Sequence, residues 1–306
     1  MNVRGIDVRI QGKLVRTARL ELDKYEFLDD PNTMVESLKT LATRIDIFHF
    51  LQRLPETLDP EPDTSPKYRY PMVWDNLAVL PVSTYDHWWN HQVRNAPRGR
   101  VRTAQKKGVT VQEVPFDDAL VRGIQQIYNE CPLRQGKPFT HYGEDLDTVR
   151  RGAATFLERS VFAGAFLDHQ MIGFTKLVMN DRRTQACLMH IVSMVQHKDK
   201  APSNALIAQA VRSCAERNIR YLVYQNFAYG NKQHDSLSDF KERNGFRRVN
   251  LPRYYVPLTA TGRIAFHLGL HKKLADRFTE SVVAKLRDLR TNWYHKKFQS
   301  AQEAAL

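Results

Sequence analysis

Residues 200–227 read KAPSNALIAQAVRSCAERNIRYLVYQNF, residues 236–249 read SLSDFKERNGFRRV, and residues 251–258 read LPRYYVPL. The first segment combines apolar residues at helical spacing with a run of strand-forming residues at its end. In the second segment Gly245 follows a helical pattern, where a C-cap is expected, and strand-forming residues come after it. Together these segments predict a helix, a buried strand, a short helix and a final strand.

The sequence before this stretch predicts one strand, two helices and three more strands. Asp117 or Asp118 opens the first of these helices, which has apolar residues at helical spacing. Asp168 lies at the turn between two apolar runs that form a hairpin. The other predicted ranges are 109–114 for the first strand, 145–159 for the second helix, and 160–167, 171–179 and 185–195 for the strands that follow.

The N-terminal third has a pattern of its own. Residues 5–22 alternate in polarity around Gly12, as in a hairpin. Apolar residues recur at helical spacing from Asn32 to Leu54 and predict a helix over that range. Residues 72–82 read as a strand. Residues 1–94 are therefore predicted to form a separate N-terminal α/β part.

The chain carries a net charge of +13 at neutral pH, which favours polyanionic partners such as nucleic acid, anionic lipid headgroups or a phosphorylated cofactor. Two basic clusters are interleaved with apolar residues, as on the faces of folded helices. One comprises Arg94, Arg98, Arg100, Arg102, Lys106 and Lys107, and the other Lys272, Lys273, Arg277, Lys285, Arg287, Arg290, Lys296 and Lys297. Residues 259–306 are predicted to be a basic amphipathic helical segment that packs on the domain or lies on an anionic membrane.

Several chemistries lack their motifs in this sequence. The three cysteines have no metal-ligand spacing and no disulfide framework, and neither a Walker loop nor a nucleophile elbow is present. No metal is therefore expected. No apolar run reaches the ~18–20 residues of a membrane span, and residues 1–5 do not begin a secretory signal. The sequence predicts a cytoplasmic protein, or one peripheral to the inner face of the membrane.

Two motifs carry a resemblance to a known superfamily. The helix start at residues 200–204 and the motif F-K-E-R-N-G-F at residues 240–246 resemble the second half of a GNAT (Gcn5-related N-acetyltransferase) domain. V-R-T-A-Q-K-K-G-V-T-V at residues 101–111 resembles the segment that connects the two GNAT-like domains of FemAB-like transferases. The resemblance covers residues 95–258 and implies an α/β (α+β) acyl-CoA acyltransferase fold with a mixed central sheet flanked by helices. Residues 1–94 would then be a diverged or truncated GNAT-like part, and residues 259–306 a C-terminal helical appendage.

The resemblance implies transfer of an acyl group, acetyl in the first instance, from acyl-CoA to an amine. The acceptor would be a small molecule, a peptide or a sugar. FemAB-like relatives suggest a second reading in which the donor is an aminoacyl-tRNA and the first basic cluster contacts RNA. A third reading is a non-catalytic binding or membrane-associated module on a GNAT scaffold. All three readings share the fold and differ in the donor.

In GNAT proteins the donor pyrophosphate lies at a helix N-terminus, on a loop of the form R/Q-x-x-G-x-G/A, because free backbone N–H groups and the positive helix end hold an anion. Lys198, Ala201 and Ser203 match the motif positions, so alanine and serine replace the two glycines. Pro202 removes one N–H donor. A backbone N–H of the strand ending near Val195 would polarise the acyl carbonyl. The residues implied for donor binding are Val195, Lys198, Lys200, Ala201, Ser203 and Asn204.

The catalytic candidates follow from the same resemblance. Lys241 replaces the tyrosine that often protonates the departing thiolate, and it would act as that acid or lie solvated on its helix. His190 and His234 are candidate bases, with a structural role as the alternative. Asn226 and Tyr229 follow a strand at the place where the family has acceptor-facing groups. The polar loop over residues 134–142 corresponds to the region that covers the acceptor in GNAT proteins, and the donor would lie between strands 189–195 and 221–226.

Overall fold

The computed structural model describes residues 1–23, 27–59, 61–134, 137–229 and 235–270. The chain divides into two compact units. The first unit contains residues 1–81, 223–241 and 246–277, and the second contains residues 82–222, 242–245 and 278–306. No helix of the described residues is long and apolar enough to cross a bilayer.

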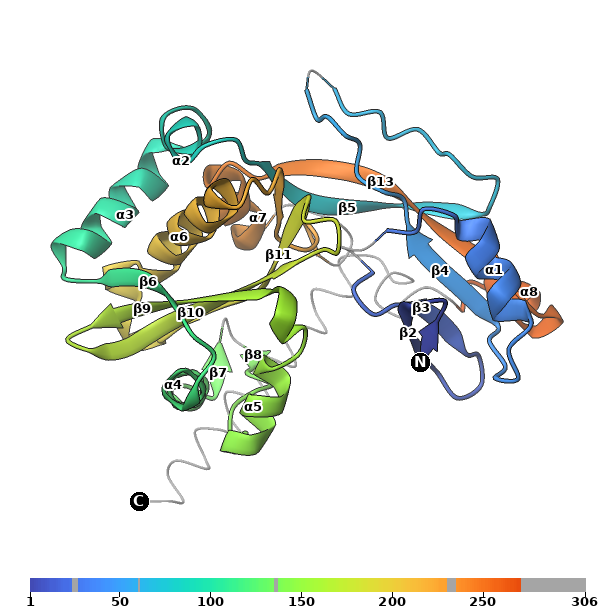
Figure 1. Ribbon diagram of the computed structural model, residues 1–306, viewed down its shortest axis with the longest axis horizontal. Coiled ribbons are helices and arrows are strands. Elements are labelled where there is room, and N and C mark those ends of the chain that lie inside the picture. Colours follow the sequence, from blue (N-terminus) through green and yellow to red (C-terminus); the bar gives the residue numbers. More distant parts are fainter. Residues whose placement is uncertain (24–26, 60, 135–136, 230–234, 271–306) are drawn as a thin grey trace. The chain divides into compact units, whose positions relative to one another are not determined.

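The second unit is built on a mixed sheet with strand order β12-β11-β10-β9-β6. Helices α3 and α6 lie on one face of this sheet, and α4 and α5 lie on the other (Figure 1). The strands are β6 (Thr110–Val114), β9 (Ser160–Leu167), β10 (Gln170–Met179), β11 (Gln185–Ser193) and β12 (Tyr221–Val223). The helices are α2 (Tyr85–His87), the π-helix η1 (Trp88–Gln92), α3 (Asn95–Lys106), α4 (Asp118–Asn129), α5 (Leu146–Ala153), the 3₁₀ helices η2 (Leu157–Arg159) and η3 (Val195–Lys200), and α6 (Pro202–Glu216), beside the short strands β7 (Leu133–Arg134) and β8 (Lys137–Pro138).

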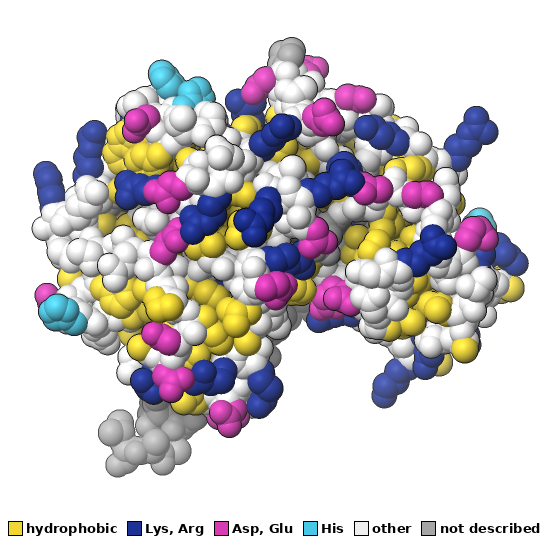
Figure 2. Space-filling model, in the orientation of Figure 1, with side chains coloured by type: hydrophobic (Ala, Val, Ile, Leu, Met, Phe, Trp, Pro, Cys, Tyr) yellow, Lys and Arg dark blue, Asp and Glu magenta, His cyan; other side chains and the backbone are white. Residues whose placement is uncertain are grey.

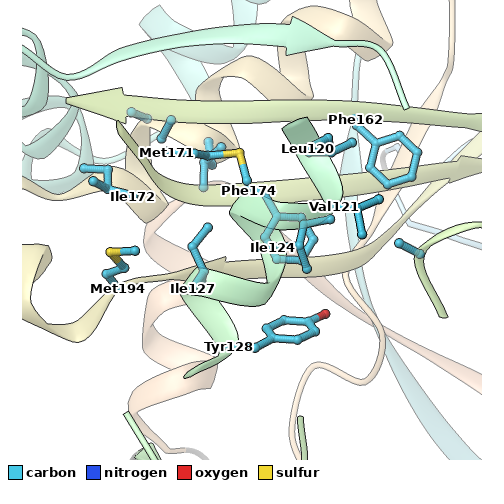
Figure 3. Packing of buried hydrophobic residues seen from close by; sticks show 14 of the residues in the cluster. Leu120, Val121, Ile124, Ile127, Tyr128, Phe162, Met171, Ile172, Phe174 and Met194 are labelled. Carbon is cyan, nitrogen blue, oxygen red and sulfur yellow. The ribbon is translucent and has the colours of Figure 1, made fainter. Parts of the chain in front are cut away.

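One hydrophobic core holds α4 against the sheet of the second unit (Figure 3). The Asp117 side chain caps α4 by accepting from the Leu120 N–H, and the apolar stripe that follows is buried. Ile124 and Ile127 are fully buried in this core beside Phe174 of β10. Because the apolar face of α4 is buried in this core, the position of the loop that follows α4 is held at its start.

The first unit has a six-stranded sheet in the order β1-β2-β3-β4-β13-β5. Strand β13 lies between β4 and β5 and pairs antiparallel with both. A separate core under this sheet includes Leu20, Phe48, Phe50 and Tyr254. The elements are β1 (Asn2–Val3), β2 (Ile6–Gln11), β3 (Thr17–Leu20), α1 (Pro31–Lys39), β4 (Ile47–Leu51), β5 (Met72–Pro81), α7 (Ser236–Arg243, of which residues 236–241 belong to this unit), β13 (Arg247–Pro257) and α8 (Ala260–His267).

The mixed α/β class with helices flanking a mixed sheet is confirmed. The helix predicted over Asn32–Leu54 was wrong in its second half, because residues 47–51 form β4, a strand whose residues are almost all buried. The units also differ from the predicted boundary near residue 94. Because β13 pairs with β4 and β5, residues 246–257 belong with the N-terminal part. Of the predicted C-terminal segment, α8 is helical, and residues 271–306 lie outside the described residues.

Candidate functional site

The connection from β11 through η3 to α6 lies where the sequence predicted donor binding. Ala201 adopts a left-handed conformation with φ of 54° and serves as the N-cap of α6. Pro202 occupies the first helical position, where its fixed φ is tolerated. A non-glycine residue at positive φ is unusual, so this loop holds a turn that the glycines of the family motif would form without strain.

Few backbone N–H groups of this loop are left for a phosphate. The Ala201 N–H donates to the Lys198 carbonyl at 3.2 Å, and the Asn204 and Ala205 N–H groups both donate to the Ala201 carbonyl. Pro202 has no N–H to offer. Within the described loop, the Ser203 N–H is the remaining donor at the start of α6. A pyrophosphate site needs several such donors that point outward. The N-terminus of α6 is therefore poorly suited to bind a pyrophosphate.

The side chains of the loop point to the same conclusion. The Ser203 Oγ lies 2.9 Å from the Ser193 Oγ at the end of β11. Asp199 is bonded by the Lys107 ammonium at 2.7 Å, which lowers the pKa of the Asp199 carboxyl by hydrogen bonding and charge. Asp199 therefore stays negative and pairs with the ammonium groups of Lys107 and Lys200, which are then less available to a phosphate. Lys198 and Val195 are exposed, and Lys200 lies beside Asp199.

Strand β11 contains a bulge close to this loop. In its pairing with β10, His190 faces Lys176 and Leu188 faces Leu177, so Met189 has no partner in the register. Bulges of this kind are frequent next to active sites, where they redirect a backbone group. The sequence placed the carbonyl-polarising N–H near Val195, and the structure offers a second position for it at Met189.

An aromatic and histidine cluster lies against β11, on the loop between α4 and α5. Nδ1 of His141 lies 3.0 Å from Oε1 of Glu144. The His141 ring stacks on Tyr128 of α4 with centroids 4.6 Å apart, and it meets the His190 ring edge-on at 6.2 Å. Because a carboxylate can only accept, we assign the proton to Nδ1, which leaves Nε2 of His141 as a free acceptor. About a third of the His141 side chain is exposed.

The loop that carries His141 is tied to the end of β11. The Arg134 guanidinium donates to the Ser193 carbonyl at 2.6 Å and to the Ile127 carbonyl at 2.7 Å. The same guanidinium lies over the Phe139 ring at 4.5 Å. The Gln196 N–H donates to the Glu130 carboxylate. These contacts join the loop, η3 and the strand end into one anchored cluster.

His190 is a neutral member of that cluster. Burial, with additional repulsion from Lys176 and His141, lowers the pKa of His190 to about 4. Lys176 itself is fully buried, and its ammonium donates to the carbonyls of Ala153 and Thr155 beyond the end of α5. Burial lowers the pKa of Lys176 to about 8. At neutral pH the predicted base His190 is therefore an uncharged imidazole.

The depressed pKa of His190 predicts a pH-dependent stability. The folded protein keeps this imidazole neutral down to about pH 4, while the unfolded chain takes up the proton below pH 6.5. The stabilising effect is therefore complete above pH 6.5 and is lost as the pH falls towards 4. We expect the wild type to lose about 2 kcal/mol more than His190→Gln between pH 7.5 and pH 5, measured by urea unfolding. Parallel pH dependences of the two proteins would contradict this.

The other catalytic candidates lie together in the first unit. Lys241 is fully buried on α7, and its ammonium donates to the Asn226 carbonyl. Its Nζ lies 4.5 Å from the Tyr224 ring centroid and 4.8 Å from that of Tyr229. Of the two readings of Lys241, the solvated helix residue was therefore wrong, because carbonyl and aromatic groups enclose the ammonium. His234 lies outside the described residues.

A buried charge network occupies the sheet of the same unit. Arg253 of β13 is 7% exposed. It donates to the Asp23 carboxylate at 2.7 Å and to the Asp75 carboxylate at 2.9 Å. Arg19 also bonds Asp23, and the Asn226 amide bonds Asp75 at 2.8 Å. Each carboxylate thus has at least two donors, which is what a buried charge requires.

The predicted site residues therefore do not all lie in one unit. The donor-loop residues and His190 lie in the second unit, and Asn226, Tyr229 and Lys241 lie in the first. His141 lies in the loop over residues 134–142 that was predicted to cover the acceptor, but neither His141 nor Glu144 was predicted to be catalytic. The signal that could have found them is a histidine followed three residues later by a carboxylate, in a long loop rich in aromatic residues.

No protein-family model and no curated protein matches this sequence. Solved structures do match its fold. The C-terminal domain of a protein named as a lysylphosphatidylglycerol synthetase from Agrobacterium fabrum superposes with a TM-score of 0.56 at 11% identity, covering 88% of this chain and 87% of that one. L-PGS from Bacillus licheniformis gives a TM-score of 0.52 at 12% identity, covering 86% and 85%. A tandem GNAT protein from the clavulanic acid biosynthesis pathway gives 0.45 at 13% identity, covering 79% and 75%.

The chain thus has a GNAT-like fold, as the resemblance implied. The two similar structures with TM-scores above 0.5 span most of both chains, so the likeness extends over both units.

Proposed function

We propose that this protein is an acyltransferase that moves an aminoacyl group from an aminoacyl-tRNA to an amine acceptor. The observation that carries the proposal is that one unit contains the bulged strand β11, the connection from β11 to α6 (the donor-side loop), and the His141–Glu144 pair. A polarising N–H beside a proton acceptor is what acyl transfer to an amine needs.

The choice of donor rests on the loop before α6. Acyl-CoA carries a pyrophosphate that needs several outward N–H groups, whereas most N–H groups of this loop already donate to backbone carbonyls. An aminoacyl-tRNA brings its acyl group on a ribose oxygen and needs no pyrophosphate cradle. The names of the similar structures, which describe an aminoacylated phospholipid as product, support this choice.

The chain's own residues suggest the following roles. Nε2 of His141 takes a proton from the acceptor amine, and Glu144 stabilises the imidazolium that results. The amine nitrogen then bonds to the acyl carbon, and the bond from that carbon to the ribose oxygen breaks. The same proton passes from His141 to the departing ribose oxygen, so the base is regenerated. The Met189 N–H of the bulge is the candidate that stabilises charge on the carbonyl oxygen.

A transfer assay with two labelled donors tests the proposal. The full chain is incubated with total tRNA charged with ¹⁴C-amino acids, and in parallel with ¹⁴C-acetyl-CoA. The amine acceptors are glucosamine and a lysine-containing peptide. Vesicles of phosphatidylglycerol, which offers hydroxyl groups and no amine, are tested beside them because one similar structure is named for a lipid product. We expect label to leave the charged tRNA and appear on one of the two amines, and label on phosphatidylglycerol alone would contradict an amine acceptor. Transfer from acetyl-CoA alone, or from neither donor, contradicts the proposal.

A further inference from the structure

The surface formed by α2, η1, α3 and the adjoining part of α6 has a regular arrangement of cations. Arg94, Arg98, Arg102 and Lys106 are spaced by four residues along α3 and its N-cap. Four residues of an α-helix rise about 6 Å, so these side chains form one row about 18 Å long. In Figure 2 the region occupied by α2 and α3 in Figure 1 carries Lys, Arg and His side chains and few acidic ones. Residues 85–107 contain six Lys and Arg residues and one acid, Asp86.

Two stacked aromatic rings lie between two guanidinium groups beside this row. Arg102 lies over the Trp89 ring at 5.8 Å, and Arg98 donates to the Trp89 carbonyl at 3.2 Å. The Trp89 ring stacks on Tyr85 at 15° with centroids 6.1 Å apart, and Arg212 of α6 lies over Tyr85 at 4.6 Å. These contacts hold the Arg102 and Arg212 guanidinium groups in fixed positions on the aromatic rings, and cations held in this way can bind phosphates.

Most of these cations are available for a ligand. Arg94 is paired with Glu242. Among the described residues, Arg98, Arg102, Lys106 and Arg212 have no carboxylate partner in an ion pair, so their charge is not neutralised by the protein. Their charge is complementary to a phosphodiester backbone, which carries one negative charge for every ~1.7 Å of duplex axis.

A membrane fits this surface less well. An amphipathic helix binds lipid by burying an exposed apolar face. The apolar face of α3, formed by Pro97, Val101 and Ala104, is already buried against α6. Among the described residues 75–134 and 137–141, no large hydrophobic side chain is exposed. The surface therefore offers charge and stacked rings without an apolar face to insert.

We propose that Tyr85, Trp89, Arg98, Arg102, Lys106 and Arg212 form a docking surface for an RNA backbone. This inference rests on the proposed function, since it assigns the tRNA part of the donor to a surface of the second unit. The cations bind phosphates without reading sequence, and the Trp89–Tyr85 stack holds Arg102 and Arg212 in place for those contacts.

The test compares two triple variants of the full chain with equal charge change. Arg98→Gln/Arg102→Gln/Lys106→Gln removes the row, and the control Lys13→Gln/Arg122→Gln/Arg263→Gln removes three exposed cations from other elements. Binding of unfractionated deacylated tRNA is measured from 50 to 300 mM KCl, together with binding of phosphatidylglycerol–phosphatidylcholine vesicles and the melting temperature. We expect the first variant to bind tRNA at least tenfold more weakly. We also expect it to lower the slope of log K against log salt by about 2 to 3. The control and both melting temperatures should stay close to wild type.

The other outcomes separate the inference from the function. If the wild type binds tRNA and the two triple variants lose equal affinity, the proposed docking surface is wrong. This result leaves the proposed aminoacyl transfer standing, because the transfer assay tests it separately. If wild type binds vesicles through this row and does not bind tRNA, the partner is a membrane and the inference is overturned. If wild type neither binds tRNA nor transfers label from it, both proposals fail.

Discussion

Exchange of His141 for glutamine is expected to lower kcat for aminoacyl transfer by about 10²- to 10⁴-fold, the usual loss when a general base is removed. Glutamine keeps the size of the side chain and cannot take up the proton. KM for the charged tRNA should change little, because the ring touches no part of the donor-side loop in the arrangement we infer. The measurement is steady-state transfer to the acceptor that the wild type uses, from pH 5.5 to 9.

Two variants separate chemistry from folding in this experiment. Glu144→Gln leaves His141 in place and weakens its orientation, so an intermediate loss is expected. His169→Asn replaces an exposed histidine in the β9–β10 turn, where asparagine accepts the positive φ of 69°, and should retain full activity. If His141→Gln keeps wild-type kcat, His141 is not the base.

Exchange of Arg253 for methionine is expected to destabilise the first unit by about 3–5 kcal/mol, because it removes the cation that two largely buried carboxylates share. Asp23 and Asp75 each lose one charged donor, and Asp23 keeps its bond to Arg19. Burial alone would lower the pKa of Arg253, but the two carboxylates raise it above its ordinary value. The measurement is urea unfolding at pH 7.5.

The matched control for this variant lies on the same strand. Arg248→Met changes an exposed arginine of β13 and should shift stability by no more than about 0.5 kcal/mol. Arg253→Lys keeps the charge and loses the planar fork, so it should fall between the two. Equal stability of Arg253→Met and Arg248→Met would show that the network contributes little.

Much of the second unit could be predicted from local pattern. The strands β9, β10 and β11 and the helix α6 lie within a few residues of their predicted ranges, because alternating or helical apolar spacing decides them. The helix predicted over Asn32–Leu54 was wrong in its second half because the apolar spacing of α1 continues into β4. Residues 47–51 read IFHFL, and aromatic and β-branched residues buried in a sheet favour a strand.

The candidate site was less predictable for a different reason. His141 and His190 are 49 positions apart, and only the anchoring of the loop by Arg134 to the end of β11 brings their rings together. Nothing in the sequence indicates that Tyr224 and Tyr229 enclose the Lys241 ammonium. Such contacts depend on tertiary structure, which a single sequence does not display.

The position of β13 between β4 and β5 has a consequence for how the protein is made. Residues 1–81 leave the ribosome before the rest of this unit, but their sheet lacks the strand between β4 and β5 until residues 247–257 have been synthesised. At about 5–20 residues per second, β4 waits roughly 10–40 s for that partner. Nearly all described residues of the second unit lie in the continuous stretch 82–222, so it can fold during that interval. During translation the N-terminal strands would therefore have unpaired edges, and this is the period in which we expect a nascent chain to need a chaperone.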